Sequence, residues 1–382
     1  MSAKHDRVIA ALEKREPDRV PTMDMMVEYS NIQEILGRRT IPFEPVFKNP
    51  YAARVIDFLG AHLFTTKPLD MAMDMFTYDR TAASVKMGYD SAWVQHTPVF
   101  RSGGSHRLTD AFGRYFELAF HSRGNLATPM YMGGLIDGPD AWHAWDKKGI
   151  FRIPEKNYRA YSKVQKAFGD DLFIFGSFSG GLFEVTWQSM GFDSFVACTR
   201  REKAFLGSVI RFYTDLYCLI LEAQADAGLP GVVYSDDLAY RSGPMLNPKM
   251  VDELFGDGYR RLTATAHKLG MKIIIHSCGN VYELLDLFAD CGFDGVHALE
   301  PTAGVELKKA KEMIGNRLCL LGNVDVTHIL VDATKDEVFE AVMQSIEDAG
   351  GGGGYILAPT NSHPDISVQR LRWMLEAVEK YG

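Results

Sequence analysis

Short apolar runs alternate with longer amphipathic segments through the second half of the chain. The runs are rich in β-branched and aromatic residues, which is typical of strands buried on both faces. They lie at residues 231–235 (GVVYS), 272–276 (KIIIH), 295–299 (GVHAL), 318–322 (LCLLG) and 355–358 (YILA). Segments with helical periodicity separate or follow them, at residues 248–269, 281–291, 305–314, 335–348 and 367–381. This alternation predicts parallel strands joined by right-handed helical crossovers.

Two earlier segments extend the pattern toward the N-terminus, at residues 20–25 and 172–176 (LFIFG). With about eight strands in all, the chain is predicted to adopt an α/β fold of the (β/α)8 TIM-barrel type. A doubly wound parallel sheet is the alternative. It would require a glycine-rich phosphate-binding turn after its first strand, and PTMDMM at residues 21–26 is not such a turn.

Residues 80–150 interrupt the strand–helix rhythm. SVKMGYDSAWVQHTPVF and HRLTDAFGRYFELAF have the pattern of hairpin strands. We therefore predict one barrel domain over residues 1–382, with residues 80–150 forming a β-rich insertion over its mouth. The glycine run at residues 350–354 directly precedes a strand, which favours a helix-to-strand turn over a linker.

Composition narrows the function classes. Of the 382 residues 46% are hydrophobic, and the net charge of −8 comes with basic residues that are scattered along the chain. This distribution argues against a nucleic-acid surface and fits a protein that handles a small molecule. No uninterrupted apolar run approaches the roughly 18 residues of a membrane span. The charged N-terminal segment lacks the apolar core of a signal peptide, and the five cysteines are too scattered for a disulfide framework. We expect a cytoplasmic protein.

Polar side chains follow each of the five strands of the second half. In a barrel the carboxyl ends of the strands form one mouth, where active sites lie. One polar strand end means little because loops are generally polar, whereas five that share a mouth indicate a site. The side chains, in chain order, are Asp236, Asp237 and Tyr240, His276 and Cys278, Glu300, Asn323 and Asp325, and Asn361 and His363.

His276 and Cys278 are the first candidates for chemistry. Positions i and i+2 of a strand point the same way, so the two side chains can converge. Imidazole nitrogen with thiolate sulfur is a ligand pair that zinc prefers, and Glu300 could supply an oxygen. The alternative is a buried histidine bonded to a backbone carbonyl beside a small buried cysteine. Of the other four cysteines, Cys198, Cys218 and Cys319 have patterns of packed positions, and Cys291 is expected at a helix end on the opposite rim.

The adjacent carboxylates Asp236 and Asp237 also have two interpretations. They could bind Mg²⁺ or act as acid and base, or one of them could cap a following helix. Tyr234 and Tyr240 would place aromatic walls beside the pair, which favours a functional role.

Several segments resemble the uroporphyrinogen decarboxylase superfamily, which also contains the zinc-dependent methylcobalamin:coenzyme M methyltransferases. They are RVIAALEKREPDRVP at the start, DAFGRYFE, GLFEVTWQSMG, VYSDDLAYRSGPMLNP, the long block from HSCGN to GNVD, and GGYILAPTNSHPD near the end. The resemblance runs nearly end to end and implies a (β/α)8 barrel.

The decarboxylase branch fits this chain poorly. Its members share an N-terminal RQAGRY segment whose arginines hold substrate carboxylates, and the corresponding TMDMMVEYSNIQ has no arginine. His62 lies near the place of that branch's catalytic aspartate, Trp187 stands for its tyrosine, and Asn361 falls near its C-terminal histidine. An octa-acidic porphyrinogen needs cationic partners, so the missing arginines count against this reaction.

The methyltransferase branch resembles the chain better. Its zinc ligands correspond to His276 and Cys278, and Glu300 resembles its oxygen ligand. Asn361 or Ser362 replaces its second zinc cysteine, so His363 becomes the candidate fourth ligand. Zinc with fewer thiolates is a stronger Lewis acid, which favours oxygen or nitrogen substrates over thiols such as coenzyme M. No D-x-H-x-x-G corrinoid motif occurs, so the resemblance implies a cobalamin on a separate corrinoid protein.

We therefore predict a zinc-assisted, corrinoid-linked methyltransferase or demethylase acting on a small substrate, without nucleic-acid or membrane partners. In this prediction Asp236, Asp237, Tyr240, Asn323 and Asp325 are catalytic. Substrate contacts come from Tyr234, Trp187 and Asn361, and metal ligands from His276, Cys278, Glu300 and His363. Two alternatives stay open, a tetrapyrrole decarboxylase such as uroporphyrinogen decarboxylase, and a non-catalytic barrel that binds a corrinoid, a tetrapyrrole or a partner protein.

Overall fold

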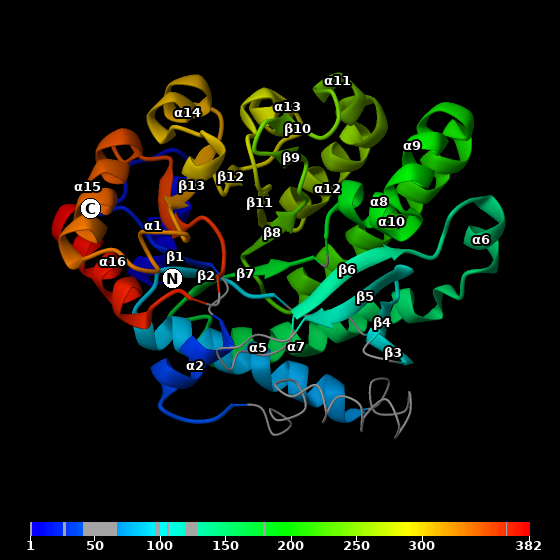
Figure 1. Ribbon diagram of the computed structural model, residues 1–382. Helices are drawn as coiled ribbons and strands as arrows, with labels where there is room; N and C mark the ends of the chain where they lie inside the picture. Colours follow the sequence, from blue (N-terminus) through cyan, green and yellow to red (C-terminus); the bar gives the residue numbers. More distant parts are fainter. Residues whose placement is uncertain are drawn as a thin grey trace.

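The computed structural model describes residues 2–25, 28–40, 67–95, 100–104, 107–119, 128–178, 180–363 and 365–382. Eight strands pair in parallel in the order β1-β2-β7-β8-β11-β12-β13-β14 (Figure 1). A bridge between Thr22 and Leu357 joins the last strand to the first, so the sheet closes into the predicted barrel. The strands are β1 (Met23–Met25), β2 (Ser91–Trp93), β7 (Phe173–Ser177), β8 (Gly231–Ser235), β11 (Lys272–His276), β12 (Gly295–His297), β13 (Cys319–Val324) and β14 (Tyr355–Pro359).

Helices surround the barrel, and most of them are amphipathic (Figure 1). The longer ones are α1 (Ala3–Leu12), α2 (Tyr29–Leu36), α5 (Lys67–Met87), α7 (Ile153–Phe168), α8 (Leu182–Met190), α9 (Phe192–Arg201), α10 (Lys203–Asp226), α12 (Asp257–Lys268), α14 (Leu307–Ile314), α15 (Lys335–Ala349) and α16 (Val368–Tyr381). The short helices are α6 (Pro139–Ala144), α11 (Pro248–Val251) and α13 (Leu285–Asp290). The predicted helix at residues 248–269 contains a π-helical turn at Asp252–Gly256. The glycine run forms the expected turn, with positive φ at Gly352, Gly353 and Gly354.

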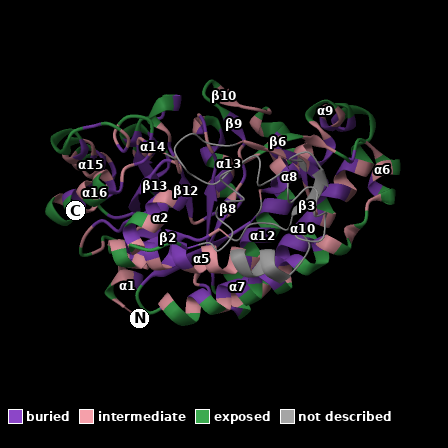
Figure 2. Cartoon of the chain, turned by 60° about the horizontal axis from the view of Figure 1, so that its bottom comes forward, coloured by how far each residue is buried: buried purple, intermediate pink, exposed green. Residues whose placement is uncertain are grey.

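Strand alternation divides the core into two layers. In β11 the side chain of Ile274 packs inside the barrel, whereas Ile273 and Ile275 pack outward against the helices. Figure 2 shows the resulting buried centre with exposed residues on the outer helices. The interior is filled with side chains from the strands and α1, among them Met23, Trp93, Phe175, Val233, Leu321 and Ile356.

A four-stranded antiparallel sheet is inserted between β2 and α7. Its strands are β3 (Phe100–Gly104), β4 (Arg107–Asp110), β5 (Arg114–Ala119) and β6 (Thr128–Gly134). The Tyr131 hydroxyl donates to the Gln188 carbonyl at 2.9 Å, and the Ile136 amide donates to the Ser189 carbonyl at 2.9 Å. The sheet therefore stands against α8, which follows the carboxyl end of β7. Its role over the mouth stays a prediction.

The predicted start of this insertion needs a correction. Residues 84–87 end α5, and Ser91–Trp93 form barrel strand β2 rather than part of a hairpin. All three residues of β2 are buried. A strand this short shows no alternation, so its sequence cannot be distinguished from that of a hairpin strand.

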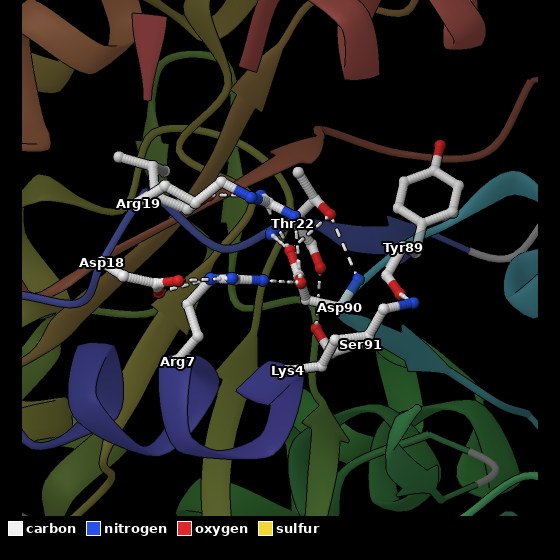
Figure 3. Close-up of polar contacts among 9 residues, drawn as sticks. Lys4, Arg7, Asp18, Arg19, Thr22, Tyr89, Asp90 and Ser91 are labelled. Carbon is white, nitrogen blue, oxygen red and sulfur yellow. Dashed lines mark hydrogen bonds and ion pairs between the residues drawn. The ribbon is translucent and has the colours of Figure 1, made fainter. Parts of the chain in front are cut away.

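A charged cluster closes the amino-terminal end of the barrel. Figure 3 shows Asp90, just before β2, between the guanidinium groups of Arg7 and Arg19. The Asp90 carboxylate is fully buried and also accepts from the Thr22 amide at 2.9 Å and hydroxyl at 3.0 Å. Arg7 pairs at the same time with Asp18. The cluster therefore fixes α1 to the first two strands.

Helix α10 is apolar for most of its length. Within the described part of the chain it is the one helix long and apolar enough to cross a membrane. Its most apolar window is 56% buried in the protein, as expected of a core helix. The sequence prediction considered only uninterrupted apolar runs and therefore passed over it.

Candidate active site

Three potential metal ligands meet at the carboxyl ends of β8 and β11. His276 ends β11, Cys278 follows two residues later, and Asp237 lies two residues after β8. The His276 Nε2 atom lies 3.5 Å from Cys278 Sγ and 3.7 Å from Asp237 Oδ1. All three ligand atoms lie within 4.8 Å of one another. Tetrahedral zinc holds its nitrogen, sulfur and oxygen ligands about 3.5 Å apart, so the donor set fits this metal with one position left open.

The His276 imidazole is a neutral donor. Burial lowers its pKa to about 3. On its other side, Nδ1 lies 2.6 Å from Nδ1 of His297, which is the last residue of β12. The Trp93 ring packs on His276 with ring centroids 5.0 Å apart. Neutral imidazole is the form that coordinates metals, so His276 is ready to bind without losing a proton.

The Cys278 thiol sits in a strongly acidic environment. Burial raises its pKa far above the usual range, and the carboxylates of Asp237 and Glu300 raise it further. The Cys278 amide donates to Asp237 Oδ1 at 2.8 Å, and the Asn361 amide nitrogen donates to Cys278 Sγ at 3.3 Å. A cation bound between the sulfur and the carboxylate would lower the pKa of Cys278 and stabilise its thiolate.

The two adjacent aspartates have different environments. The Asp236 carboxylate is fully buried and accepts from the amides of Phe183 and Glu184 at 3.1 and 2.9 Å. It also accepts from the Tyr259 hydroxyl at 2.8 Å, and burial raises its pKa to about 6. Asp236 therefore caps α8, which is the helix-capping alternative for this pair, and its catalytic role stays a prediction. The Asp237 side chain is 41% exposed and joins the metal group instead.

Tyr234 does not face the mouth either. Its side chain is fully buried, and its hydroxyl accepts from the Leu182 amide and donates to Asp236 at 3.3 Å. Tyr234 therefore supports the start of α8, and its contact with substrate stays a prediction. Tyr240 lies on the rim, in the short hairpin of β9 (Ala239–Tyr240) and β10 (Gly243–Pro244), and is 59% exposed.

Two of the predicted metal ligands do not join the metal group. Within the described residues that group contains neither Glu300 nor His363. The Glu300 carboxylate instead accepts from the Gly279 amide at 2.9 Å. His363 Nδ1 accepts from the Asp365 amide at 3.2 Å, and His363 lines a small cavity near β1. Both side chains accept hydrogen bonds from backbone amides, and their roles as metal ligands stay predictions.

Asn323 and Asp325 also lie apart from the donors. They line a cavity of about 570 Å³ beside α14 and α15, and none of the three donor residues lines it. Asn323 Oδ1 accepts from the Ser345 hydroxyl of α15 at 3.4 Å. Asp325 accepts from the Thr327 and His328 amides and shapes the following turn. These contacts are local structural ones, and the catalytic roles of Asn323 and Asp325 stay predictions.

The remaining predicted residues have mixed outcomes. Asn361 contacts Cys278 of the metal group, so it lies where it could also contact a substrate bound there. Trp187 on α8 packs edge-on against Tyr131 of the inserted sheet, with ring centroids 5.3 Å apart. A role for either residue in substrate binding stays a prediction. His62 lies outside the described residues.

Glu184 is a candidate that the sequence interpretation missed. It lies in the first turn of α8, and the Gln188 side-chain amide donates to it at 3.2 Å. Burial and the charges of Asp237 and Asp236 raise its pKa to about 8, so it is protonated at neutral pH. The Arg114 guanidinium lowers this pKa in part. The available signal was a glutamate in the first turn after a predicted strand, in the segment GLFE.

A parallel barrel with histidine, cysteine and aspartate donors at its strand ends defines a TIM-barrel protein with a candidate metal centre. The family model for uroporphyrinogen decarboxylase (URO-D) matches residues 151–381. That is more than half of the chain, and the protein belongs to this family.

Two relatives carry the name of a methyltransferase. Methylcobamide:CoM methyltransferase MtaA of Methanosarcina barkeri is 24% identical over 233 residues, and the protein of that name from strain Fusaro is 23% identical over 233 residues. The match covers 60% of this chain and 64% of each relative, less than two thirds of their length.

Solved structures support the fold. A methyltransferase from Methanosarcina mazei has a TM-score of 0.73 at 19% identity, over 99% of this chain and 98% of that chain. A B12-independent methionine synthase from a Shewanella species has a TM-score of 0.53 at 11% identity, over 94% and 96% of the two chains. At these identities the likeness shows the barrel fold alone.

Proposed function

We propose that the protein moves a methyl group between a small substrate and a cobalamin carried by a separate corrinoid protein, with zinc bound by Asp237, His276 and Cys278. The carrying observation is the convergence of these three ligand atoms within 4.8 Å at the barrel mouth. The similarity to proteins named methylcobamide:CoM methyltransferase supports the same reaction class. A cytoplasmic location belongs to this proposal as well.

The donor set indicates the kind of substrate. Zinc would act as a Lewis acid that lowers the pKa of a coordinated substrate atom. With a single thiolate, from Cys278, the centre favours an oxygen or nitrogen atom over the sulfur of coenzyme M. The Asn361 amide donates to Cys278 Sγ and draws negative charge away from the sulfur. This would also make the zinc a stronger Lewis acid.

Glu184 is the proposed proton source of the site. Its carboxyl group is protonated at neutral pH and lies beside Asp237. When a methyl group leaves an oxygen or nitrogen atom, that atom needs a proton, and a nearby neutral carboxyl group can donate it. In the reverse direction the same carboxylate would accept the proton.

A tetrapyrrole decarboxylase is the second candidate, favoured by the family to which the chain belongs. The Arg114 guanidinium is paired with Asp110 at 2.6 Å and Gln188 at 2.9 Å. It is therefore already occupied, and the arginine-free segment at residues 22–33 adds no cation. Neither Arg114 nor this segment therefore offers an octa-acidic porphyrinogen the cationic partners that it needs.

The test is the metal content of protein purified without chelator. We expect about one zinc per chain, and loss of this zinc in Cys278→Ser, because zinc needs its thiolate ligand. Cys198→Ser on α9, a buried cysteine outside the donor group, serves as the matched control and should keep the metal. Methyl transfer from methylcobalamin to oxygen and nitrogen acceptors is then measured for the same proteins.

Either of two results would contradict the proposal. Failure of the wild-type protein to take up added zinc would remove the metal centre, and porphyrinogen decarboxylation would then be assayed. Full zinc binding by Cys278→Ser would remove the assigned ligand set.

A further inference from the structure

A row of hydrogen-bonding groups extends from the metal group along the carboxyl ends of the neighbouring strands. It links three strands, from His276 on β11 to His297 on β12 and then, past β13, to the backbone of β14. The two Nδ1 atoms lie 2.6 Å apart, and His297 Nε2 lies 2.9 Å from the Pro359 carbonyl oxygen. His276 and His297 are 4% and 0% exposed, so surrounding water does not compete for these contacts.

The carbonyl group fixes the direction of this row. A carbonyl oxygen can only accept, so His297 Nε2 carries the hydrogen. Two ring nitrogens 2.6 Å apart must share a single hydrogen, because two N–H groups would repel each other. A neutral His297 that is protonated at Nε2 has a lone pair on Nδ1. The shared hydrogen therefore belongs to His276 Nδ1.

The opposite assignment is unfavourable. If the hydrogen sat on His297 Nδ1, that ring would carry two hydrogens and a positive charge. His297 is fully buried and lies edge-on to Trp93, with ring centroids 6.4 Å apart. Burial disfavours a charged imidazolium in such a place. The neutral row, with every ring nitrogen partnered, is the stable arrangement.

We propose that His297 is a positioning residue that holds His276 in the tautomer whose Nε2 lone pair faces the metal position. That lone pair points to the side where Cys278 Sγ lies at 3.5 Å and Asp237 Oδ1 at 3.7 Å. The inference rests on the proposed function, because the metal centre is part of that proposal.

The choice of a second histidine has a chemical consequence. Metal-binding histidines usually donate their other N–H to a carboxylate, a carbonyl group or water, which fixes the tautomer. Here a neutral imidazole takes that place and passes the hydrogen bond on to Pro359. It adds no negative charge, so the bound metal keeps more of its Lewis acidity than it would beside a carboxylate.

The tautomer is measured directly on metal-free wild-type protein by nitrogen NMR of labelled histidine. The His276 signals are identified by their loss in His276→Gln. We expect a protonated Nδ1 and an unprotonated Nε2. A protonated Nε2 would overturn the inference, whether or not the protein binds zinc.

Zinc affinity provides the second readout, from competition with a chromophoric chelator. His297→Phe keeps the ring shape but offers no acceptor to His276, and we expect zinc binding to weaken about 10–100-fold. His297→Gln offers an amide oxygen and should restore part of the affinity. His267→Phe on α12 is the matched control, because His267 pairs with Asp294 outside the row. Unchanged affinity in folded His297→Phe would contradict the inference.

The outcomes separate this inference from the proposed function. Absence of zinc uptake by the wild-type protein would overturn the metal centre, while the NMR result would still decide the tautomer. If His297→Phe does not fold, the affinity of His297→Gln and the wild-type tautomer decide the question. In that case, a mixture of tautomers at His276 in the wild-type protein would count against the assigned role.

Discussion

Burial determines the protonation of several carboxyl groups in this protein. Asp24 on β1 is a clear case, because it is almost fully buried and accepts a hydrogen bond from the Ser84 hydroxyl. Burial raises its pKa from 3.8 to about 6, and the nearby positive charge of Arg80 compensates only in part. The folded protein therefore holds this proton over a pH range in which the unfolded chain has lost it.

Because of Asp24, the free energy of unfolding is expected to depend on pH. The raised pKa of Asp24 stabilises the folded state below about pH 4, and this contribution is lost as the pH rises to about 6. Asp24→Asn removes this contribution, so the wild-type protein should lose on the order of 3 kcal/mol relative to the variant across this range. Urea unfolding of both proteins at several pH values measures it. A constant difference between the two would contradict the assignment.

Helix α8 shows how a strand end positions a whole element. Its first turn has no side-chain cap of its own, and the cap comes from Asp236 after β8. Gly181 makes this approach possible, since a Cβ atom there would lie 2.1 Å from the Asp236 carboxylate carbon. The helix in turn brings Glu184 to the metal group and Trp187 to the inserted sheet.

Adjacent substitutions should separate the two aspartates. Asp236→Ala leaves two buried amides and the Tyr259 hydroxyl without their acceptor, and we expect the free energy of unfolding to fall by about 3 kcal/mol. Asp237→Asn keeps an acceptor for the Cys278 amide and should change stability by less than about 1 kcal/mol. It should nevertheless weaken zinc binding. Chemical unfolding and metal titration of both variants provide the measurement, and the reverse pattern would exchange their roles.

The buried Asp90 cluster and the candidate metal group lie at opposite ends of the barrel. The Asp90 cluster lies where β1 and β2 begin (Figure 3), and the metal group lies where β8 and β11 end. In barrels of this type the first end serves stability and the second serves function. Changes at the two ends should therefore have independent effects.

Asp90→Asn tests this separation. It leaves the Arg7 and Arg19 guanidinium groups without their buried charge partner, so the free energy of unfolding should fall by about 3–5 kcal/mol. Zinc content and affinity should match those of the wild-type protein, because the barrel lies between the two clusters. Urea unfolding and metal analysis are run on the same preparations. Loss of zinc from folded Asp90→Asn would show that the ends are coupled.

Family membership and fold were accessible from the sequence. The predicted strands at residues 231–235 and 272–276 coincide with β8 and β11, because strand periodicity and turn residues are local signals. The convergence of His276 and Cys278 followed from the same local rule, since alternate strand residues share a face.

Tertiary structure decided the partner of each polar side chain. Asp236 and Asp237 are neighbours in the chain, yet one caps α8 and the other joins the metal group. His297 looked like part of an ordinary strand, and its role depends on side chains and a carbonyl group from two other strands. Local sequence sets backbone conformation and the face on which a side chain lies. The contact that a buried polar atom makes depends on which distant segments fold against it, and hydrogen bonds form only between groups that the whole fold brings within reach.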